Sequence, residues 1–243
     1  MSSATPMTLS TYDVPPNRPE VLVATEAGEL LGLIGPAQAA RSVVKRTIDL
    51  IGSIGGLAFL LPVLILIGVL VRLDSRGPIL FRQRRVGLRG REFWCLKFRT
   101  MVPDAEARLR DLEARNESAG GVLFKIKDDP RVTPLGRFLR RSSLDEFPQL
   151  WNVVRGEMSL VGPRPLQLRD SERLEQLNPE GYHRRLTVIP GVTGPWQVGG
   201  RSEVDSNGML QLDLDYIENW SIANDLVILL KTVIVVAAGR GAS

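Results

Sequence analysis

The sequence predicts a mainly helical α/β fold with a small β-hairpin, anchored to a membrane from one side. Three observations lead to this prediction. Leu50–Val71 contains no charged residue, and about 20 apolar residues suffice to cross a bilayer. Apolar and polar residues alternate on both sides of Gly87–Gly90, which is typical of a hairpin. Beyond residue 131, apolar residues recur mostly with helical spacing.

The first part of the chain, residues 1–42, is expected to be a flexible acidic tail. Acids outnumber bases in it, and several prolines lie among many small residues. Such a composition favours irregular backbone. A short strand at Val21–Thr25 is the regular element predicted there.

The apolar segment is predicted to be a membrane helix. It begins too far from the N-terminus and is too long for a cleaved signal peptide. Lys45 and Arg46 precede it and an arginine-rich stretch from Arg72 follows it, and basic flanks tend to stay in the cytoplasm. Pro62 near its middle removes a backbone donor and bends a helix. We therefore expect residues 43–72 to enter the membrane, break at Pro62 and return to the same face; a buried core helix is the alternative.

The remaining chain, residues 73–243, is expected to form a cytoplasmic domain, with the hairpin at residues 79–101 and a Gly- and Pro-rich loop at residues 187–201. The last predicted helix, Asn224–Ala238, contains an apolar run too short to span a bilayer. It suits a helix lying on the membrane surface, and an ordinary packed helix is the alternative. Other helices are predicted at Asp104–Ser118, 131–156, Glu172–Leu177 and Met209–Ile217.

Composition and charge limit the chemistry. Cys95 is the only cysteine and His183 the only histidine, so an intrachain disulfide and a cysteine-based zinc site are excluded. The net charge is +4, and basic residues are concentrated between Arg72 and Arg99. This stretch predicts an anionic partner such as a nucleic acid, a phosphorylated ligand or a lipid headgroup, unless it is only a solvated charged face.

The acidic pair Asp145–Glu146 is the first candidate for catalysis. Ser143 and Glu146 have the spacing of a capping box, which predicts a helix start, and Pro148 agrees because proline is tolerated in a first helical turn. On this pattern alone the two acids could simply cap a helix. Several arginines surround the pair in the sequence, however, and adjacent carboxylates in such a field can stay ionised and hold a divalent metal or attack phosphorus.

Two further motifs place an arginine beside a backbone rich in proline or glycine. In Gly162–Pro165, two prolines fix the backbone around Arg164, which suits bidentate phosphate recognition; a structural turn is the alternative. In residues 190–201, glycines would let backbone N–H groups approach a phosphate beside Arg201. Walker A and dinucleotide-binding sequences are absent, which disfavours P-loop ATPases and Rossmann enzymes.

Taken in chain order, these motifs resemble those of the bacterial sugar transferases, the monotopic polyprenyl-phosphate phosphoglycosyl transferases. The resemblance covers nearly everything but the tail, and Leu144–Pro148 and Gly162–Pro165 are its most specific parts. The matching stretches are Lys45–Asp49, Pro62, Phe81–Gly87, Lys97–Met101, Asp129–Arg131, Gly136–Arg140, Ser143–Val153, Met158–Pro165, Pro190–Gly194, Trp196–Val198, Gly200–Arg201 and Asp215–Trp220.

The resemblance implies an enzyme at the cytoplasmic face of the bacterial inner membrane that initiates polysaccharide assembly. Such enzymes use Mg²⁺ to move a sugar 1-phosphate from a UDP-sugar to undecaprenyl phosphate, and they release UMP. The resemblance implies that Asp145 is the nucleophile, which forms an aspartyl phosphosugar, and a metal ligand, and that Glu146 positions or deprotonates. The residues expected to bind the anionic substrates are Lys97, Arg99, Arg137, Arg164 and Arg201.

We then expect membrane lipid to be a partner of this chain and do not expect it to bind nucleic acid. Whether the protein forms a homodimer is left undecided by the sequence. Two alternatives to this function remain. One is a non-catalytic, membrane-anchored basic scaffold, in which the acidic pair only caps a helix. The other is a membrane transferase that uses a different nucleotide donor. The sequence does not distinguish glucose, galactose and N-acetylated sugars as substrates.

Overall fold

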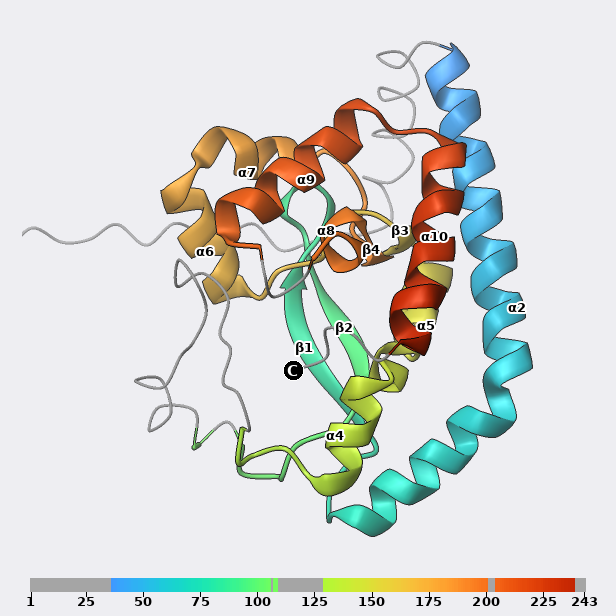
Figure 1. The fold of residues 1–243 in the computed structure, drawn as a ribbon, viewed down its shortest axis with the longest axis vertical. Helices are drawn as coiled ribbons and strands as arrows, with labels where there is room; N and C mark the ends of the chain where they lie inside the picture. Colours follow the sequence, from blue (N-terminus) through green and yellow to red (C-terminus); the bar gives the residue numbers. More distant parts are fainter. Residues whose placement is uncertain (1–35, 106, 109–128, 201–203, 239–243) are drawn as a thin grey trace, which may run out of the picture. The chain divides into compact units, whose positions relative to one another are not determined.

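The computed structural model describes residues 36–105, 107–108, 129–200 and 204–238. The chain divides into two units, Met1–Val44 and Lys45–Ser243, and every contact discussed below lies within the second. The described part is mostly helical with two small sheets (Figure 1), which confirms the predicted fold class in its coarse form.

The elements in chain order are α2 (Pro36–Asp74), β1 (Leu80–Val86), η1 (Leu88–Gly90), β2 (Glu92–Phe98), α4 (Pro134–Arg141), η3 (Leu144–Glu146), α5 (Gln149–Arg155), β3 (Ser159–Val161), α6 (Leu168–Leu177), α7 (Pro179–Arg185), β4 (Gly191–Thr193), α8 (Pro195–Val198), α9 (Ser206–Glu218) and α10 (Ile222–Ala237). Strands β1 and β2 form the predicted antiparallel hairpin, and β3 and β4 pair in parallel. The second sheet was not predicted, because strands of three residues leave no alternating pattern to detect.

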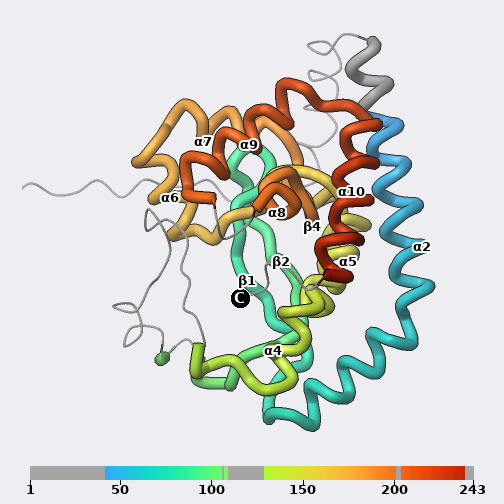
Figure 2. The backbone as a smooth tube through the Cα atoms, in the orientation of Figure 1, coloured from blue at the N-terminus to red at the C-terminus, as the bar shows by residue number. Residues whose placement is uncertain are grey.

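The longest element, α2, contains the predicted apolar segment. It begins earlier than the expected residue 43, and its helical backbone continues through Pro62, so the predicted break in the helix at this residue is wrong. The helix nevertheless changes direction along its length (Figure 1 and Figure 2), as expected for a helix that contains a proline. Among the described residues, α2 is the one helix long and apolar enough to cross a membrane, and its most apolar 18-residue stretch has a mean hydropathy of 2.8.

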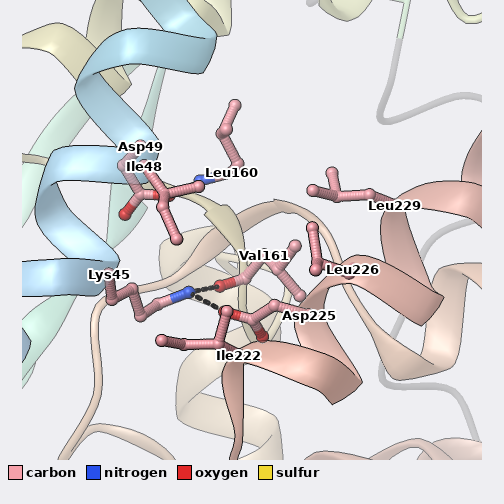
Figure 3. Close-up of a pocket in the computed structure, with 9 residues that line it drawn as sticks. All are labelled: Lys45, Ile48, Asp49, Leu160, Val161, Ile222, Asp225, Leu226 and Leu229. Carbon is pink, nitrogen blue, oxygen red and sulfur yellow. Dashed lines mark hydrogen bonds and ion pairs between the residues drawn. The ribbon is translucent and has the colours of Figure 1, made fainter. Parts of the chain in front are cut away.

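Polar contacts hold the N-terminal part of α2 on the folded body. The Lys45 ammonium donates to the Val161 carbonyl (3.0 Å) and forms an ion pair with Asp225 of α10 (2.6 Å), as Figure 3 shows. The buried Asp49 carboxylate accepts a hydrogen bond from the Ser159 hydroxyl (3.0 Å). Because buried polar groups must find partners, these contacts fix the position of α2 against β3 and α10.

Apolar contacts hold the C-terminal part of α2 on the same body. Ile67 and Val71 are buried in a cluster with Phe98 of β2 and Leu139 of α4. Between the two ends, a Cβ atom on Gly52 would lie 2.7 Å from the side chain of Leu160. The glycine therefore lets this part of the helix approach β3 closely.

The helical predictions are confirmed in part. The expected helices at Met209–Ile217 and Asn224–Ala238 correspond to α9 and α10, and Glu172–Leu177 forms the end of the longer α6. Residues 131–156, predicted as a helical region, form two helices, α4 and α5, separated by the turn at residues 142–148. Helix α7 was not predicted. The expected tail strand at Val21–Thr25 and most of the expected helix at Asp104–Ser118 lie outside the described residues.

Candidate active site

The acidic pair lies in a tight turn between α4 and α5. Leu144–Glu146 forms η3, and Ser143 before it has a left-handed backbone with φ of 55°, which is uncommon for residues other than glycine. The predicted helix start is confirmed only as this short 3-10 helix, because the α-helix α5 begins at Gln149. The predicted capping box is wrong, because the Ser143 side chain makes no cap hydrogen bond. Pro148 directly precedes α5, so its expected place near a helix start is confirmed.

Packing and a buried amide hold this turn beside the hairpin. Leu144 packs against the cluster that buries the end of α2. On α5, the Asn152 side chain accepts from Leu96 N–H (3.0 Å) and donates to the Trp94 carbonyl (2.8 Å). Asn152 thus fixes α5 to the edge of β2, and Lys97 of the same strand reaches the acidic pair.

Glu146 is held between two cations. Its Oε1 accepts from Lys97 Nζ at 2.6 Å and from Arg164 Nη2 at 2.8 Å. Burial alone would raise the pKa of Glu146, but Arg164 and Lys97 outweigh burial and hold this pKa well below its usual range. Glu146 is therefore ionised at neutral pH and is a weak proton acceptor.

Asp145 has different surroundings. Its side chain is 7% exposed, and none of the residues that the structure describes donates a hydrogen bond to its carboxylate. Burial, aided by the neighbouring charge of Glu146, raises the pKa of Asp145 to about 6, although Lys97 opposes this rise. A carboxylate that is buried, ionised at neutral pH and not hydrogen-bonded by the described part of the chain can attack an electrophile or bind a cation.

The acidic pair fits a magnesium ion only with help from a substrate. Within the described ranges, no cluster of three or more His, Cys, Asp or Glu side chains is placed to hold a metal ion. Mg²⁺ commonly takes one or two carboxylates and completes its coordination with phosphate oxygens and water. Asp145 has carboxylate oxygens to offer, whereas Glu146 is already engaged by Lys97 and Arg164. Asp145 is thus the residue that fits this role.

Arg140 of α4 is a site residue that the sequence reasoning missed. Its Nε donates to Thr100 Oγ1 (2.9 Å). Burial lowers the pKa of Arg140, and the nearby Asp145 carboxylate is the strongest charge that opposes this shift. The sequence carries three arginines along α4, and nothing in their pattern says which one faces the acidic pair.

Arg99 lies elsewhere than expected. Its Nη2 donates to the carbonyls of Val71 (3.2 Å) and Ser75 (2.6 Å) and to Ser75 Oγ (2.9 Å), and its Nη1 donates to the Pro78 carbonyl. Arg99 therefore caps the end of α2 through its two terminal nitrogens, whereas its buried Nε has no hydrogen-bond partner among the described residues. This structural role was not expected, and substrate binding by Arg99 stays a prediction.

The other expected binding residues have three different outcomes. Lys97 and Arg164 meet at Glu146. Arg137 lies exposed on α4, and no contact described here joins it to the acidic pair. Arg201 lies outside the described residues. Their roles in binding remain predictions.

The glycines of residues 190–201 serve backbone packing. A Cβ atom on Gly191 would lie 2.1 Å from the nitrogen of Gly162, and one on Gly194 would lie 2.2 Å from the Gly162 carbonyl oxygen. The N–H of Gly191 donates to the Pro163 carbonyl (2.9 Å). The expectation that these glycines approach a phosphate is therefore corrected for Gly191, whose N–H is used within the protein. Close approach of the β4 segment supports the loop that carries Arg164.

Comparison with known proteins finds one matching family model and several similar transferases. A family model described as bacterial sugar transferase matches residues 40–239. The chain is 43% identical over 209 residues to the UDP-galactose-lipid carrier transferase of Erwinia amylovora, a match covering 85% of this chain and 43% of that protein. It is 44% identical over 196 residues to the undecaprenyl-phosphate glucose phosphotransferase of Komagataeibacter xylinus, covering 78% of this chain and 35% of the other.

A third relative has a similar length. The exopolysaccharide production protein ExoY of Sinorhizobium fredii is 40% identical over 210 residues, and the match covers 85% of this chain and 91% of that protein. The present chain thus spans less than half of the first two relatives and nearly all of the third. The names of the first two relatives mention different sugars, galactose and glucose.

Proposed function

This chain belongs to the bacterial sugar transferase family, and on that premise we propose that it transfers a sugar 1-phosphate from a UDP-sugar to undecaprenyl phosphate and releases UMP. The reaction starts polysaccharide assembly at the cytoplasmic face of the bacterial inner membrane. One observation carries this proposal: the Asp145 carboxylate is buried without a hydrogen-bonding partner among the described residues, in the field of Lys97, Arg140 and Arg164. Such a field attracts an anionic diphosphate donor.

In the first step, an ionised Asp145 oxygen forms a bond to the phosphorus atom that carries the sugar. The bond from this phosphorus to the bridging oxygen of UMP breaks, and its electron pair leaves with UMP. Lys97 and Arg164 stabilise the negative charge that develops on the phosphate oxygens. Mg²⁺, held by Asp145 and the donor phosphates, would supply further charge neutralisation when bound.

In the second step, a phosphate oxygen of undecaprenyl phosphate attacks the same phosphorus and releases the Asp145 carboxylate. The product is a lipid-linked diphosphosugar. A covalent intermediate lets two bulky anions use one site in turn, so they need not be bound together.

Glu146 acts by positioning in this proposal. A carboxylate whose pKa lies well below its usual range rarely accepts a proton at neutral pH. It can, however, hold Lys97 and Arg164 in place through the two hydrogen bonds it accepts. Of the two roles considered for Glu146, positioning therefore has the better support.

The membrane arrangement that we propose is the re-entrant one. Support comes from both ends of α2: Lys45 near its start and Val71 near its end contact the same folded body. A straight crossing would place these two residues on opposite sides of the bilayer. Large apolar side chains of α2 that face outward would meet the lipid, namely Ile51, Ile54, Phe59, Leu61, Ile65, Leu66 and Leu73.

Helix α10 supplies a second lipid contact in this arrangement. Its N-terminal part lies beside α2 (Figure 1), where Asp225 pairs with Lys45. Its outward side chains Leu226, Leu230, Val233 and Ile234 are more than half exposed. This amphipathic pattern fits a helix lying at the membrane surface.

The scaffold alternative has less support. It requires the acidic pair to serve only as a helix cap. The turn η3 has no side-chain cap, and burying the Asp145 carboxylate has a cost in stability that a capping role would not repay.

The test is release of UMP from UDP-sugars in the presence of undecaprenyl phosphate and Mg²⁺. A panel of UDP-galactose, UDP-glucose and UDP-N-acetylated sugars identifies the sugar, and GDP- and CDP-linked donors test the rival transferase. Lipid-dependent UMP release from one donor, lost in Asp145→Asn, is the expected result. Absence of UMP release from every UDP-sugar by folded protein would refute the proposal.

A further inference from the structure

Two buried arginines hold the backbone beside the Arg164 side chain. The Arg164 carbonyl accepts a hydrogen bond from Nη2 of Arg185, and the Pro165 carbonyl accepts one from Nη1 of Arg85 (2.5 Å). Arg185 and Arg85 are 4% and 7% exposed. Taking a guanidinium out of water is costly, so a fold rarely uses two of them on adjacent carbonyls for packing alone.

Arg185 is fixed in turn by an acid on another helix. Its Nε donates to Oδ2 of Asp213 at 2.7 Å, which joins α7 to α9. Asp213 is 1% exposed. A continuous set of hydrogen bonds therefore runs from Asp213 through Arg185 and Arg164 to Glu146.

The loop that carries Arg164 has few other means of being fixed. Pro163 and Pro165 lack an N–H group, so hydrogen bonds can hold this segment mainly through its carbonyls. The Pro163 carbonyl is held by the Gly191 N–H, and the next two are held by the buried arginines. Fixing the carbonyl of Arg164 fixes the direction in which its side chain leaves the backbone toward Glu146.

We propose that Asp213, Arg185 and Arg85 are positioning residues for the Arg164 guanidinium. They lie outside the acidic pair and act on the reaction through the position of Arg164. This inference rests on the proposed function, because it takes Arg164 to stabilise the donor phosphates. It extends that function to a second layer of residues on α7, α9 and β1.

The chain offers a matched control for this set of hydrogen bonds. Arg184 is adjacent to Arg185 and also pairs with an acid on α9, Glu218. This second pair joins the same two helices, but both of its side chains are about half exposed, and it does not touch the Arg164 backbone. Arg184→Lys and Arg185→Lys therefore make the same substitution in two ion pairs between the same helices.

The first measurement is kcat/KM for the UDP-sugar. Arg185→Lys keeps the charge but cannot reach both Asp213 and the Arg164 carbonyl, because lysine lacks the guanidinium fork. We expect it to lower kcat/KM roughly 10- to 100-fold, as small misplacements of catalytic groups do, and we expect Arg184→Lys to leave it unchanged. Asp213→Asn, which keeps the side-chain shape, should act in the same direction as Arg185→Lys. Equal losses in Arg184→Lys and Arg185→Lys would overturn the proposal.

The second measurement separates positioning from a general structural role. In an Arg164→Lys background, Arg185→Lys should cost little further activity, because the group that it positions is already lost. If Arg185→Lys instead caused a general structural defect, it would lower kcat/KM by the same factor in the wild-type and Arg164→Lys backgrounds. A full additional loss in the double variant would therefore overturn the proposal.

A third measurement does not depend on catalysis. If Arg185 orders the Arg164–Glu146 pair, then Arg164→Lys should lower Tm less in the Arg185→Lys background than in the wild type. Strictly additive Tm shifts would overturn the positioning proposal. If the wild type transfers no sugar from any donor, the proposed function fails, and this Tm comparison still decides whether Arg185 orders Arg164.

Discussion

Asp145 and Glu146 are neighbours in the chain, yet their carboxylates have opposite surroundings. Glu146 accepts hydrogen bonds from two cations, and its pKa is held well below the usual range. Asp145 is buried, receives no hydrogen bond from the described residues, and has its pKa raised to about 6 by burial. The pair therefore combines one fixed, strongly ionised acid with one acid that is free to react.

The first prediction concerns the nucleophile. Asp145→Asn should abolish turnover and also the phosphosugar adduct, because an amide cannot form the acyl phosphate. Mass spectrometry of protein incubated with the UDP-sugar alone measures the adduct, and release of UMP measures turnover. A folded Asp145→Asn protein that retained most of its activity would show that the covalent step uses another residue.

The second prediction concerns stability against pH. The folded-state pKa of Asp145, about 6, lies above its ordinary value of 3.8, so ionising this group favours the unfolded chain. The protonated Asp145 carboxyl contributes its full stabilisation of the folded state below about pH 4. This contribution is lost as the pH rises through 6. Without metal, Asp145→Asn should therefore raise the free energy of unfolding by about 2–3 kcal/mol at pH 8, from 1.36 kcal/mol per pKa unit. The variant and wild type should be equally stable near pH 3.5. An Asn variant less stable at pH 8 would contradict the raised pKa.

The third prediction concerns Arg164. Arg164→Lys keeps the charge but loses the planar fork, so it should lower kcat/KM by at least about tenfold, equivalent to 1.4 kcal/mol of transition-state stabilisation. Steady-state kinetics with the UDP-sugar measures the loss, and circular dichroism confirms folding. Unchanged kcat/KM would remove Arg164 from the donor site.

The fourth prediction concerns the packing of α4. A Cβ atom on Gly136 would lie 2.1 Å from the carbonyl oxygen of Thr100, so α4 would have to move away from the segment that binds Arg140. Gly136→Ala should destabilise the protein by about 1–3 kcal/mol, the usual cost of overpacking. Gly55→Ala is the control, because a Cβ atom on Gly55 would have no described atom within 4 Å apart from its chain neighbours and the adjacent backbone of its own helix. Similar Tm values for both variants in detergent would contradict the close contact.

The fifth prediction concerns topology. Single cysteines at Ser10 and at Asn207, which is exposed on α9, are introduced in a Cys95→Ala background. In intact spheroplasts both should resist an impermeant thiol reagent until lysis, because the re-entrant arrangement that we propose would keep both sides of α2 in the cytoplasm. Labelling of the Ser10 position alone would establish a true span. Pro62→Ala should increase labelling at that position, because it restores a backbone donor and straightens the helix.

The sequence was sufficient for features that leave a local pattern. The hairpin around Gly87–Gly90 and the long apolar helix follow from alternation and length, and the structure confirms both. The turn at Ser143 does not follow a local rule, because capping-box spacing is compatible with helix and turn alike. Tertiary packing of Leu144 decides between them.

The site was harder to predict than the fold. The sequence gives no reason to assign different roles to its basic side chains, such as Lys97, Arg99, Arg137 and Arg164. Their roles depend on which carbonyls and carboxylates lie nearby after folding. Arg99 meets the end of α2, whereas Arg164 meets Glu146. The different roles of these residues depend on contacts between parts of the chain that are far apart in the sequence, and no rule based on sequence spacing predicts such contacts.

The attachment of α2 at both ends has a practical consequence for isolating the protein. Ser159, Phe98 and Leu139 are buried against groups on α2. A chain that began after residue 74 would leave these side chains exposed and the Ser159 hydroxyl without its acceptor on Asp49. Deleting α2 would therefore remove part of the hydrophobic core. We expect a chain that begins after residue 74 to lose stability, and we expect purification to need a detergent or lipid that keeps α2 in place.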